Sequence, residues 1–522
     1  MSLLQVETLT LAIGDRTLLD GVSFVVEPGE ILGLVGESGS GKSLTGLSVV
    51  GLQPAQAWLG GRILFDGEDL LTAAAPRRIA LRGAQIGLVF QEPMTALNPL
   101  MRIGDQVAEA VRLDPGRRRE AKARTQSLLD RVGLAGVDPG RFPHQLSGGQ
   151  RQRAAIAVAL ARGPRLLIAD EPTTALDVTT QAVILDLLGT LAREEGLGLI
   201  LVSHDLAVVA QVADRIAVMQ SGRIVEQGAA RQLISGPSHD YTRRLVADAA
   251  LAPKAQVPPR DEPPVLEMVE VTRRYAPASR RGAAVFAVSG ASFAVRPGET
   301  VALVGESGSG KSTLARAALG LEPLQGGVVR VGGAVFPARD RTVLRAQRRQ
   351  IQAVLQDPHS SFDPRWTVER IVAEPLHLLD AAVAPAERRR RVETALVEVG
   401  LSAEAADRLP HQFSGGQRQR IAIARALIVE PKILVMDEAV SALDVTVRAG
   451  VLRLLADLSR RLDVGCLFVT HDMAVARAIA DRVMVMRQGR IVEDGPAMAV
   501  FETPSHPYTA ELIAATPVLA AG

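Results

Sequence analysis

Cysteine is almost missing from this chain of 522 residues, in which Cys466 is the only one. A single cysteine excludes an intramolecular disulfide and a metal cluster held by thiolates. The run GCLFVTH around Cys466 is mainly apolar. We therefore expect this residue to be a small buried side chain on a strand.

Long apolar runs are missing as well. No stretch approaches the roughly 18 uncharged apolar residues that a membrane-spanning helix needs. The first residues include the acids Glu7 and Asp15, with no basic leader and no small-residue cleavage site. We therefore expect no secretory signal, no crossing of the membrane by this chain itself, and a position on the cytoplasmic side.

The charge balance and the choice of basic residues are also informative. The net charge of +2 is too small to indicate a nucleic-acid footprint. Of the 59 basic residues only five are lysines, and two of these, Lys42 and Lys311, occupy the same place in two copies of one octapeptide. In a chain so rich in arginine, a compact ammonium at both places indicates a phosphate ligand.

The sequence contains an internal duplication. The octapeptide GESGSGKS occurs at residues 36–43 and 305–312, and SGGQRQR occurs at 147–153 and 414–420, at offsets of 269 and 267 residues. The offset of 267 also relates the dipeptide Asp-Glu at 170–171 to that at 437–438. So long a period indicates duplicated domains rather than a solenoid, and each copy is long enough to bury its own core.

The Pro-rich stretch at residues 252–264 separates the copies and predicts an extended linker between domains at 1–251 and 265–522. Within each half, short β-rich runs alternate with helical stretches, which predicts an α/β fold with a mainly parallel sheet. A helical insert follows at roughly residues 92–146 and 357–413. We expect its first helix to open after Asn98-Pro99 and after Asp363-Pro364, where a capping side chain precedes proline.

A phosphate-binding loop is predicted in both halves, because the octapeptide lies between a strand-like run and a helical stretch. Its glycines let backbone N–H groups turn towards phosphates, the lysine neutralises charge and the serine hydroxyl can bind magnesium. The alternative is a glycine-rich turn that binds nothing, which two copies in the same context disfavour. The predicted phosphate-binding residues are Gly36, Glu37, Ser38, Gly39, Ser40, Gly41, Lys42 and Ser43, and Gly305, Glu306, Ser307, Gly308, Ser309, Gly310, Lys311, Ser312 and Thr313.

Two carboxylates end an apolar run further along each half. The first, Asp170 or Asp437, is predicted to hold Mg²⁺ together with the loop serine, Ser43 or Ser312. The second, Glu171 or Glu438, is placed to polarise a water that attacks the γ-phosphate. Alone, such a pair could merely cap the next helix, but the phosphate loop upstream favours the catalytic interpretation.

The segments LSGGQ and FSGGQ, which begin at Leu146 and Phe413, resemble the signature of ATP-binding cassette proteins. Each signature serine lies 23 residues before the metal aspartate. The resemblance covers both halves almost end to end and implies tandem P-loop ABC-type nucleotide-binding domains, each with a mainly parallel sheet core, an antiparallel β part and a helical subdomain. It also implies the following roles: Q-loop glutamines Gln91 and Gln356, which bind Mg²⁺ and take part in catalysis, D-loop aspartates Asp177 and Asp444, and switch histidines His204 and His471.

The same resemblance implies that the halves pair head to tail, so that ATP on one phosphate loop is completed by the signature of the other half. A helix start with free N–H groups suits a γ-phosphate. ATP would then hold the halves together, and its hydrolysis would release them. The signature residues in this role are Ser147, Gly148, Gly149 and Gln150, and Ser414, Gly415, Gly416 and Gln417.

The two halves differ at the position where the family stacks an aromatic residue on adenine. Tyr275 fits this role in the second half, whereas the same alignment places Ile13 in the first. Because stacking on an aromatic ring contributes about 1–3 kcal/mol, we predict weaker ATP binding at the Lys42 loop. Ala439 stands where the first half has Pro172, but both catalytic glutamates are present, so we expect both sites to hydrolyse ATP.

Each half ends with a similar tail, GPSHDYT at 236–242 and TPSHPYT at 503–509. The tails resemble those of importers for oligopeptides, dipeptides and nickel, in which the cassettes serve two transmembrane permease subunits and an extracytoplasmic binding protein from the cytoplasmic face of the membrane. The alternative is an ordinary helix start. We expect no iron–sulfur cluster because the tails lack cysteine. Peptides are the first expected cargo, with nickel, opines and glutathione left open.

A different class also has tandem cassettes, namely ribosome-associated translation factors and DNA-repair ATPases. Their charged helical linkers, zinc cysteines or long coiled-coil insertions are missing here, and so is a basic stripe. We therefore expect no nucleic-acid partner. A scaffold would require two complete catalytic sets to be idle.

Overall fold

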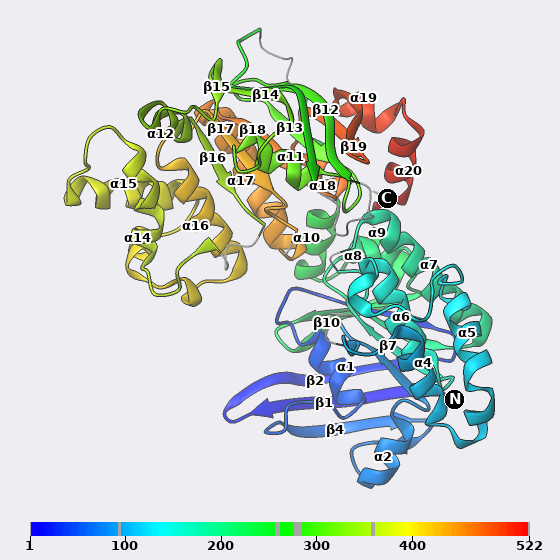
Figure 1. Cartoon of the computed structure of the whole chain (residues 1–522). Helices are drawn as coiled ribbons and strands as arrows, with labels where there is room; N and C mark the ends of the chain where they lie inside the picture. The colour runs from blue at the N-terminus through cyan, green and yellow to red at the C-terminus, as the bar shows by residue number, and fades with distance from the viewer. Residues whose placement is uncertain are drawn as a thin grey trace.

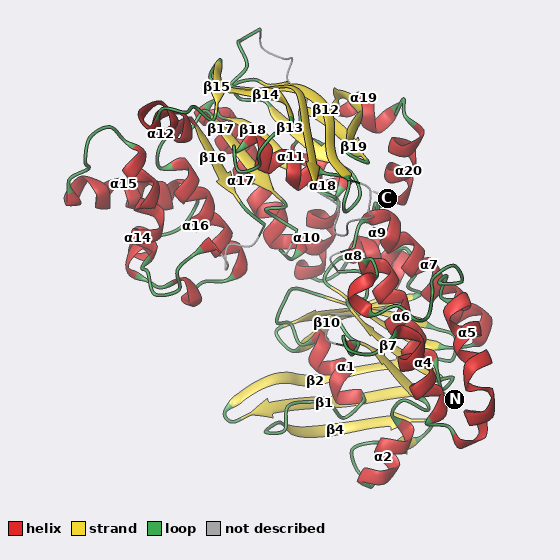
Figure 2. Cartoon of the chain, viewed as in Figure 1, coloured by secondary structure: helices red, strands yellow, loops and turns green. Residues whose placement is uncertain are grey.

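The computed structural model describes residues 2–91, 96–174, 176–255, 261–275, 284–356, 361–441 and 443–519. Figure 1 shows the chain as two halves of similar construction, with the N-terminal half running from blue to cyan-green and the C-terminal half from green to red. Each half combines sheets with surrounding helices (Figure 2). The residues at 92–95, 256–260 and 357–360, which belong to the predicted inserts and linker, lie outside the described ranges.

Each half has a six-stranded sheet in which five neighbouring strands are parallel and one edge strand is antiparallel. In spatial order the first sheet comprises β10 (Arg223–Ala229), β9 (Arg215–Gln220), β3 (Ile31–Val35), β8 (Gly198–Ser203), β7 (Leu166–Asp170) and β6 (Ile86–Val89). The second comprises β20 (Arg490–Pro496), β19 (Arg482–Arg487), β13 (Thr300–Val304), β18 (Gly465–Val469), β17 (Ile433–Asp437) and β16 (Ile351–Val354).

A four-stranded antiparallel sheet accompanies each of these sheets. The first comprises β2 (Arg16–Val26), β1 (Leu4–Ile13), β4 (Trp58–Phe65) and β5 (Glu68–Asp69). The second comprises β12 (Val285–Val295), β11 (Leu266–Tyr275), β14 (Gly326–Val331) and β15 (Ala334–Phe336). Together with the parallel strands and the helices, these sheets confirm the predicted fold class.

The central strands β3 and β13 are buried at every residue. A strand covered on both faces needs a nearly continuous apolar run. ILGLV supplies one, and TVALV supplies one after Thr300, which is itself buried. The strand β18 contains Cys466, which is buried, as the sequence predicts. Each strand that precedes a phosphate loop is therefore fixed in the middle of its half.

Helices cover the sheets and form the inserts. The helices of the first half are α1 (Lys42–Val49), α2 (Ala75–Leu81), α4 (Ile103–Arg112), α5 (Ala121–Arg131), α6 (Gly148–Leu160), α7 (Val178–Glu195), α8 (Leu206–Ala210), α9 (Ala230–Ser235) and α10 (Asp240–Ala249). Those of the second are α11 (Lys311–Ala318), α12 (Arg341–Gln350), α14 (Val368–Ala373), α15 (Pro385–Glu398), α16 (Gly415–Leu427), α17 (Val445–Leu462), α18 (Met473–Ile479), α19 (Ala497–Glu502) and α20 (Pro507–Ala515). Short 3-10 helices span Pro115–Glu120, Pro143–Gln145, Glu374–Leu378, Ala403–Asp407 and Pro410–Gln412. None of the described helices is long and apolar enough to cross a membrane.

The predicted helix starts at Asn98-Pro99 and Asp363-Pro364 are wrong. The helices α4 and α14 begin several residues later, at Ile103 and Val368. The Asn98 carboxamide oxygen accepts from the N–H of residue 100, and the Asp363 carboxylate accepts from that of residue 365. Each capping side chain therefore closes a local turn two residues on, which competes with helix formation.

The halves meet through exchanged apolar side chains. Val178 at the start of α7 packs into a cluster of the second half, and Val445 at the start of α17 packs into the large cluster of the first. The helices α10 and α17 also lie against each other, as do α7 and α20. The stretch that follows α10 also contacts the second half, where Lys254 forms an ion pair with Asp481 at 2.7 Å.

Candidate functional site

Both predicted phosphate loops connect a central parallel strand to the N-terminus of a helix. Gly36 and Gly305 open the loops with φ of 153° and 149°. A Cβ on either would collide with a backbone carbonyl, of Met219 or Met486 respectively. The residues from Gly36 to Gly41 and from Gly305 to Gly310 thus form a compact turn that needs glycine at its first position, and Ser43, Ser312 and Thr313 lie in the first turn of the following helix.

The loop lysines are folded back onto their own loops. Lys42 Nζ donates to the carbonyl oxygens of Gly36 and Glu37, at 2.8 Å in each case. Lys311 Nζ makes the corresponding bonds at 2.7 and 2.8 Å. Burial lowers the pKa of Lys42 and of Lys311, while the nearby carboxylates oppose this shift.

The loop serine and the first strand-end carboxylate lie together in both halves. Ser43 Oγ donates to Asp170 Oδ1 at 3.0 Å, and Ser312 Oγ to Asp437 Oδ1 at 3.1 Å. A hydroxyl beside a carboxylate is the hard-oxygen donor set that suits Mg²⁺ next to a phosphate. Burial raises the pKa of both aspartates, while the hydrogen bond from the loop serine opposes this shift.

The second carboxylate is held by the predicted glutamine and histidine of its own half. Glu171 accepts from Gln91 Nε2 at 2.8 Å and lies 3.1 Å from His204 Nδ1. Glu438 makes the same contacts with Gln356 at 2.8 Å and His471 at 3.3 Å. These three residues come from different segments of each half, so the fold assembles two identical constellations.

Electrostatics keep both glutamates ionised. Burial works against the charged form of Glu171, but bonds from His204 and Thr174 lower its pKa below the usual range. The pKa of Glu438 is lowered first by its hydrogen bond to His471. Burial opposes protonation of His471, yet Glu438 raises the pKa of its imidazole. An ionised carboxylate beside a buried phosphate site can orient a water molecule.

The two signature serines start helices and are exposed in this structure. Ser147 caps α6, and Ser414 caps α16. Gln150 and Gln417 complete each capping box by accepting from the serine N–H, at 3.1 and 3.0 Å. The signature glycines follow within the first helical turn. The exposure of both serines shows that the opposite phosphate loop does not cover them in this arrangement.

Each phosphate loop is nevertheless approached by the D-loop of the other half. Burial lowers the pKa of both loop lysines, and the charge of Asp444 opposes this shift at Lys42 as that of Asp177 does at Lys311. Thr179 Oγ1 also donates across the interface to Glu306 Oε1 at 3.0 Å. Thr446, at the corresponding place in the second half, has a buried hydroxyl without a partner. The contacts between the halves are therefore reciprocal but not identical.

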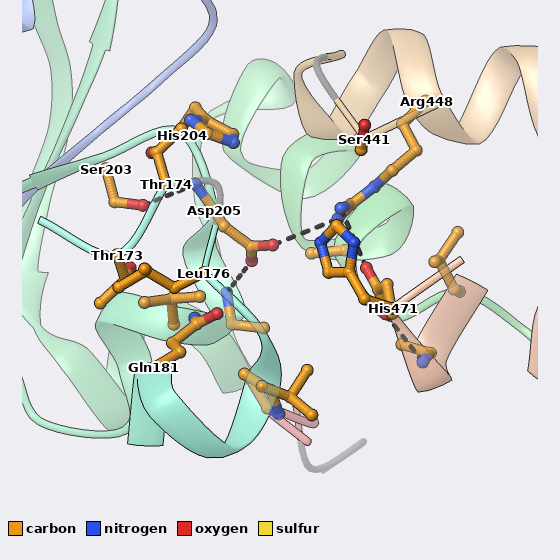
Figure 3. A pocket seen from close by; sticks show the side chains of 18 residues that line it. Thr173, Thr174, Leu176, Gln181, Ser203, His204, Asp205, Ser441, Arg448 and His471 are labelled. Atoms are coloured by element: carbon orange, nitrogen blue, oxygen red, sulfur yellow. Dashed lines mark hydrogen bonds and ion pairs between the residues drawn. The ribbon is translucent and has the colours of Figure 1, made fainter. Parts of the chain in front are cut away.

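A polar cavity of about 90 Å³ lies between the halves and is lined by both switch histidines, His204 and His471. Arg448 Nη2 contacts Asp205 Oδ2, and its Nη1 contacts Asp472 Oδ2, both at 3.2 Å. In Figure 3 a dashed line joins the Arg448 guanidinium to Asp205 of the first half. One side chain thus connects the residues that follow both histidines.

The predicted adenine positions lie at equivalent ends of β1 and β11. Tyr275 is the last residue of β11, where Arg273 stacks on its ring with Cζ 4.5 Å from the centroid. Ile13 is the last residue of β1 and packs against the apolar cluster of the first half. Equivalent places in the two halves therefore carry an aromatic ring in the second half and an aliphatic side chain in the first.

Sequence reasoning gave no role to several residues around the sites. Thr174 donates to Glu171 Oε2 at 3.0 Å, and its counterpart Ser441 donates to the carbonyl of Glu438. Tyr241 and Tyr508 contact the phosphate loops from the tails. The repetition of these tails in both halves was a signal that could have found the tyrosines. Nothing in the sequence marks Arg448, whose counterpart in the first half is Gln181.

Comparisons with known proteins found matches over most of the chain. The model of the family described as ABC transporter matches residues 19–174 and 288–441, and that of the oligopeptide/dipeptide transporter C-terminal region matches residues 492–522. Peptidoglycan transport ATP-binding protein YejF of Agrobacterium fabrum is 44% identical over 98% of this chain and 96% of its own length. Glutathione import ATP-binding protein GsiA of Escherichia coli O157:H7 is 44% identical over 99% of this chain and 90% of its own.

Among solved structures, the ATP-binding cassette MJ0796 bound to ADP and Pi is 29% identical. It covers 44% of this chain and 98% of its own length, with a TM-score of 0.41.

Proposed function

Since this chain belongs to the ABC transporter family and is an ATPase, we propose that it hydrolyses ATP at two composite sites to drive the import of peptides or similar small solutes. The observation that carries this proposal is the duplicated set of phosphate loop, metal pair, glutamate, glutamine and histidine, built with nearly the same distances in both halves. We also propose that the two domains span residues 1–251 and 265–522, joined by the linker 252–264.

Each phosphate loop binds the triphosphate through its N–H groups and its lysine. Ser43 with Asp170, and Ser312 with Asp437, would hold Mg²⁺, together with an amide oxygen from Gln91 or Gln356. Such an ion would supply positive charge beside the phosphates. Lys42 and Lys311 bond backbone carbonyls of the loop, and Lys42 also bonds the Ser40 hydroxyl. Because these acceptors are uncharged, a phosphate can take over the N–H groups without separating an ion pair.

Glu171 and Glu438 orient the attacking water and favour loss of its proton while the bond to the γ-phosphorus forms and the bond to ADP breaks. His204 and His471 keep these carboxylates ionised and in place. Since both sets have this geometry, both sites turn over. The D-loops already face the opposite phosphate loops, so a closing motion that covers Ser147 and Ser414 completes each site with donors from the other half.

The similarity of the C-terminal tail to a transporter region supports the proposed cargo and partners. The match of residues 492–522 to the oligopeptide/dipeptide transporter region, together with relatives named for glutathione import and peptidoglycan transport, supports a peptide-type cargo. The chain acts with two permease subunits and an extracytoplasmic binding protein, and it attaches peripherally to the cytoplasmic face of the membrane through the permeases.

The test is uptake by cells or vesicles that contain the chain with two permease subunits and a binding protein of the peptide-import type. Glu171→Gln combined with Glu438→Gln should abolish ATP hydrolysis and the uptake of labelled glutathione or short peptides, while the complex still copurifies. Uptake that continues without hydrolysis contradicts the proposal. Copurification with ribosomal particles instead of permeases would favour the translation-factor class.

A further inference from the structure

The tails of the two halves make the same contacts, although the proposed reaction gives them no role. Ser238 N and Oγ both donate to Glu226 Oε1 at 2.8 Å, and His239 N donates to Glu226 Oε2 at 3.0 Å. Ser505 and His506 bind Glu493 in the same way. Each histidine Nδ1 then caps the following helix by accepting from the N–H of the tyrosine. The repeated Ser-His-x-Tyr thus fixes where the tyrosine side chain goes.

That side chain reaches the phosphate loop of its own half. Tyr241 Oη accepts from Glu37 N at 3.0 Å, and Tyr508 Oη accepts from Glu306 N at 3.0 Å. The two tyrosines are only 4% and 2% exposed. Burial raises the pKa of both phenols to about 12. They remain neutral acceptors at any physiological pH.

The residue that each tyrosine contacts is the second of the loop. Its N–H is bound by the tyrosine and its carbonyl by the loop lysine, so the residue is held at both ends. The lysine bond ties the loop to itself, whereas the tyrosine bond ties it to the tail. Without the phenol oxygen, the partly buried N–H would lack an acceptor and the loop would lose this external support.

We infer that Tyr241 and Tyr508 are positioning residues that hold the phosphate loops of their own halves in the shape that binds nucleotide. The function of the Ser-His-x-Tyr tail is then to present this hydroxyl. The inference rests on the proposed nucleotide sites and assigns the tail a task within the ATPase rather than in cargo recognition.

The two copies provide the experiment with its own control. In the full-length chain, Lys311→Ala leaves the Lys42 loop as the nucleotide site to be titrated, and Lys42→Ala leaves the Lys311 loop. A fluorescent ATP analogue is titrated into each background before and after Tyr241→Phe or Tyr508→Phe. We expect each phenylalanine to weaken binding about tenfold at the loop of its own half and to leave the other loop unchanged.

The outcomes separate this inference from the proposed function. If neither lysine background binds the analogue while both tyrosines are intact, the proposed sites fail. If both backgrounds bind it but Tyr→Phe changes neither affinity, the positioning role fails. An equal loss at both loops together with a lower unfolding temperature would also overturn it, because that result identifies the tyrosines as general packing residues. Glu226→Gln, which weakens the anchor of the first tail, should reproduce a smaller loss at the Lys42 loop alone.

Discussion

The thiol of Cys466 lies inside the second half on β18. Burial raises its pKa to about 12, so at pH 8.5 only about one thiol in several thousand is ionised. We expect the folded chain to resist alkylation by iodoacetamide at this pH and to react promptly once guanidinium unfolds it. Mass spectrometry of the single cysteine measures both rates, and rapid labelling of the native chain would contradict its burial.

The adenine positions allow a second test of one side chain. Replacing Tyr275 by isoleucine should weaken ATP binding at the Lys311 loop by about 1–3 kcal/mol, which is at least fivefold, because the stacking ring is lost. Titration of a fluorescent ATP analogue in the Lys42→Ala background measures the change. Ile13→Tyr, measured at the Lys42 loop, should strengthen binding there.

The control for each substitution is the loop of the other half, titrated in the opposite lysine background, where the affinity should stay the same. Equal affinities at the two loops of the native chain would remove the basis of the prediction. An unchanged affinity after Tyr275→Ile would show that Arg273, which stacks on the ring, occupies the face that adenine needs.

Among the elements, the start of the helical insert depends on a buried glutamine in α4. Gln106 Oε1 accepts from Asn98 N at 2.9 Å, and its Nε2 donates to the carbonyls of Asn98 and Met101 at 3.0 Å. These bonds hold the turn that delays the helix. In the second half Ile371 occupies the corresponding position of α14 and is buried in the apolar cluster.

Gln106→Leu should therefore loosen the turn, because it leaves these backbone groups without partners. We expect amide hydrogen exchange at residues 97–102 to accelerate several-fold, while the central strands keep their protection. Gln126→Leu, on the exposed face of α5, is the matched control and should change nothing in this segment. Unaltered exchange in Gln106→Leu would show that packing alone maintains the turn.

The strands and phosphate loops were predictable because their signals are local. The short, almost wholly apolar runs before the two copies of GESGSGKS favour a strand covered on both faces, and β3 and β13 are such strands. The helix starts were wrong because Asn98 and Asp363 can cap a helix or close a turn, and hydrogen bonds made by the side chains of Gln106 and Arg365 favour the turn. Likewise, no local pattern could have placed Tyr241 against Glu37, 204 residues away.

In the whole molecule, Arg448 is a largely buried charge between the halves. Its side chain is 11% exposed and contacts Asp205 of the first half and Asp472 of the second. The other carboxylate oxygen of each aspartate caps the helix after a switch histidine, by accepting from Ala207 N or Ala474 N. One cation therefore neutralises two carboxylates, each of which caps the helix after a switch histidine. Glutamine at position 448, to match Gln181 in the first half, would carry no charge and could not do this.

Arg448→Gln installs the residue that the first half has at the corresponding position, and it leaves two partly buried carboxylates without their counter-charge. Breaking a buried ion pair in this way costs about 3–5 kcal/mol, so we expect a clearly lower first midpoint in thermal unfolding and faster amide exchange at Ala207 and Ala474. Arg453→Gln is the matched control on the same helix. Arg453 also bridges the halves, to Asp248 at 2.6 Å, but its side chain is 68% exposed, so its loss should cost at most about 1 kcal/mol. Equal effects of the two substitutions would show that the halves are held by their exchanged apolar side chains and not by the buried charge.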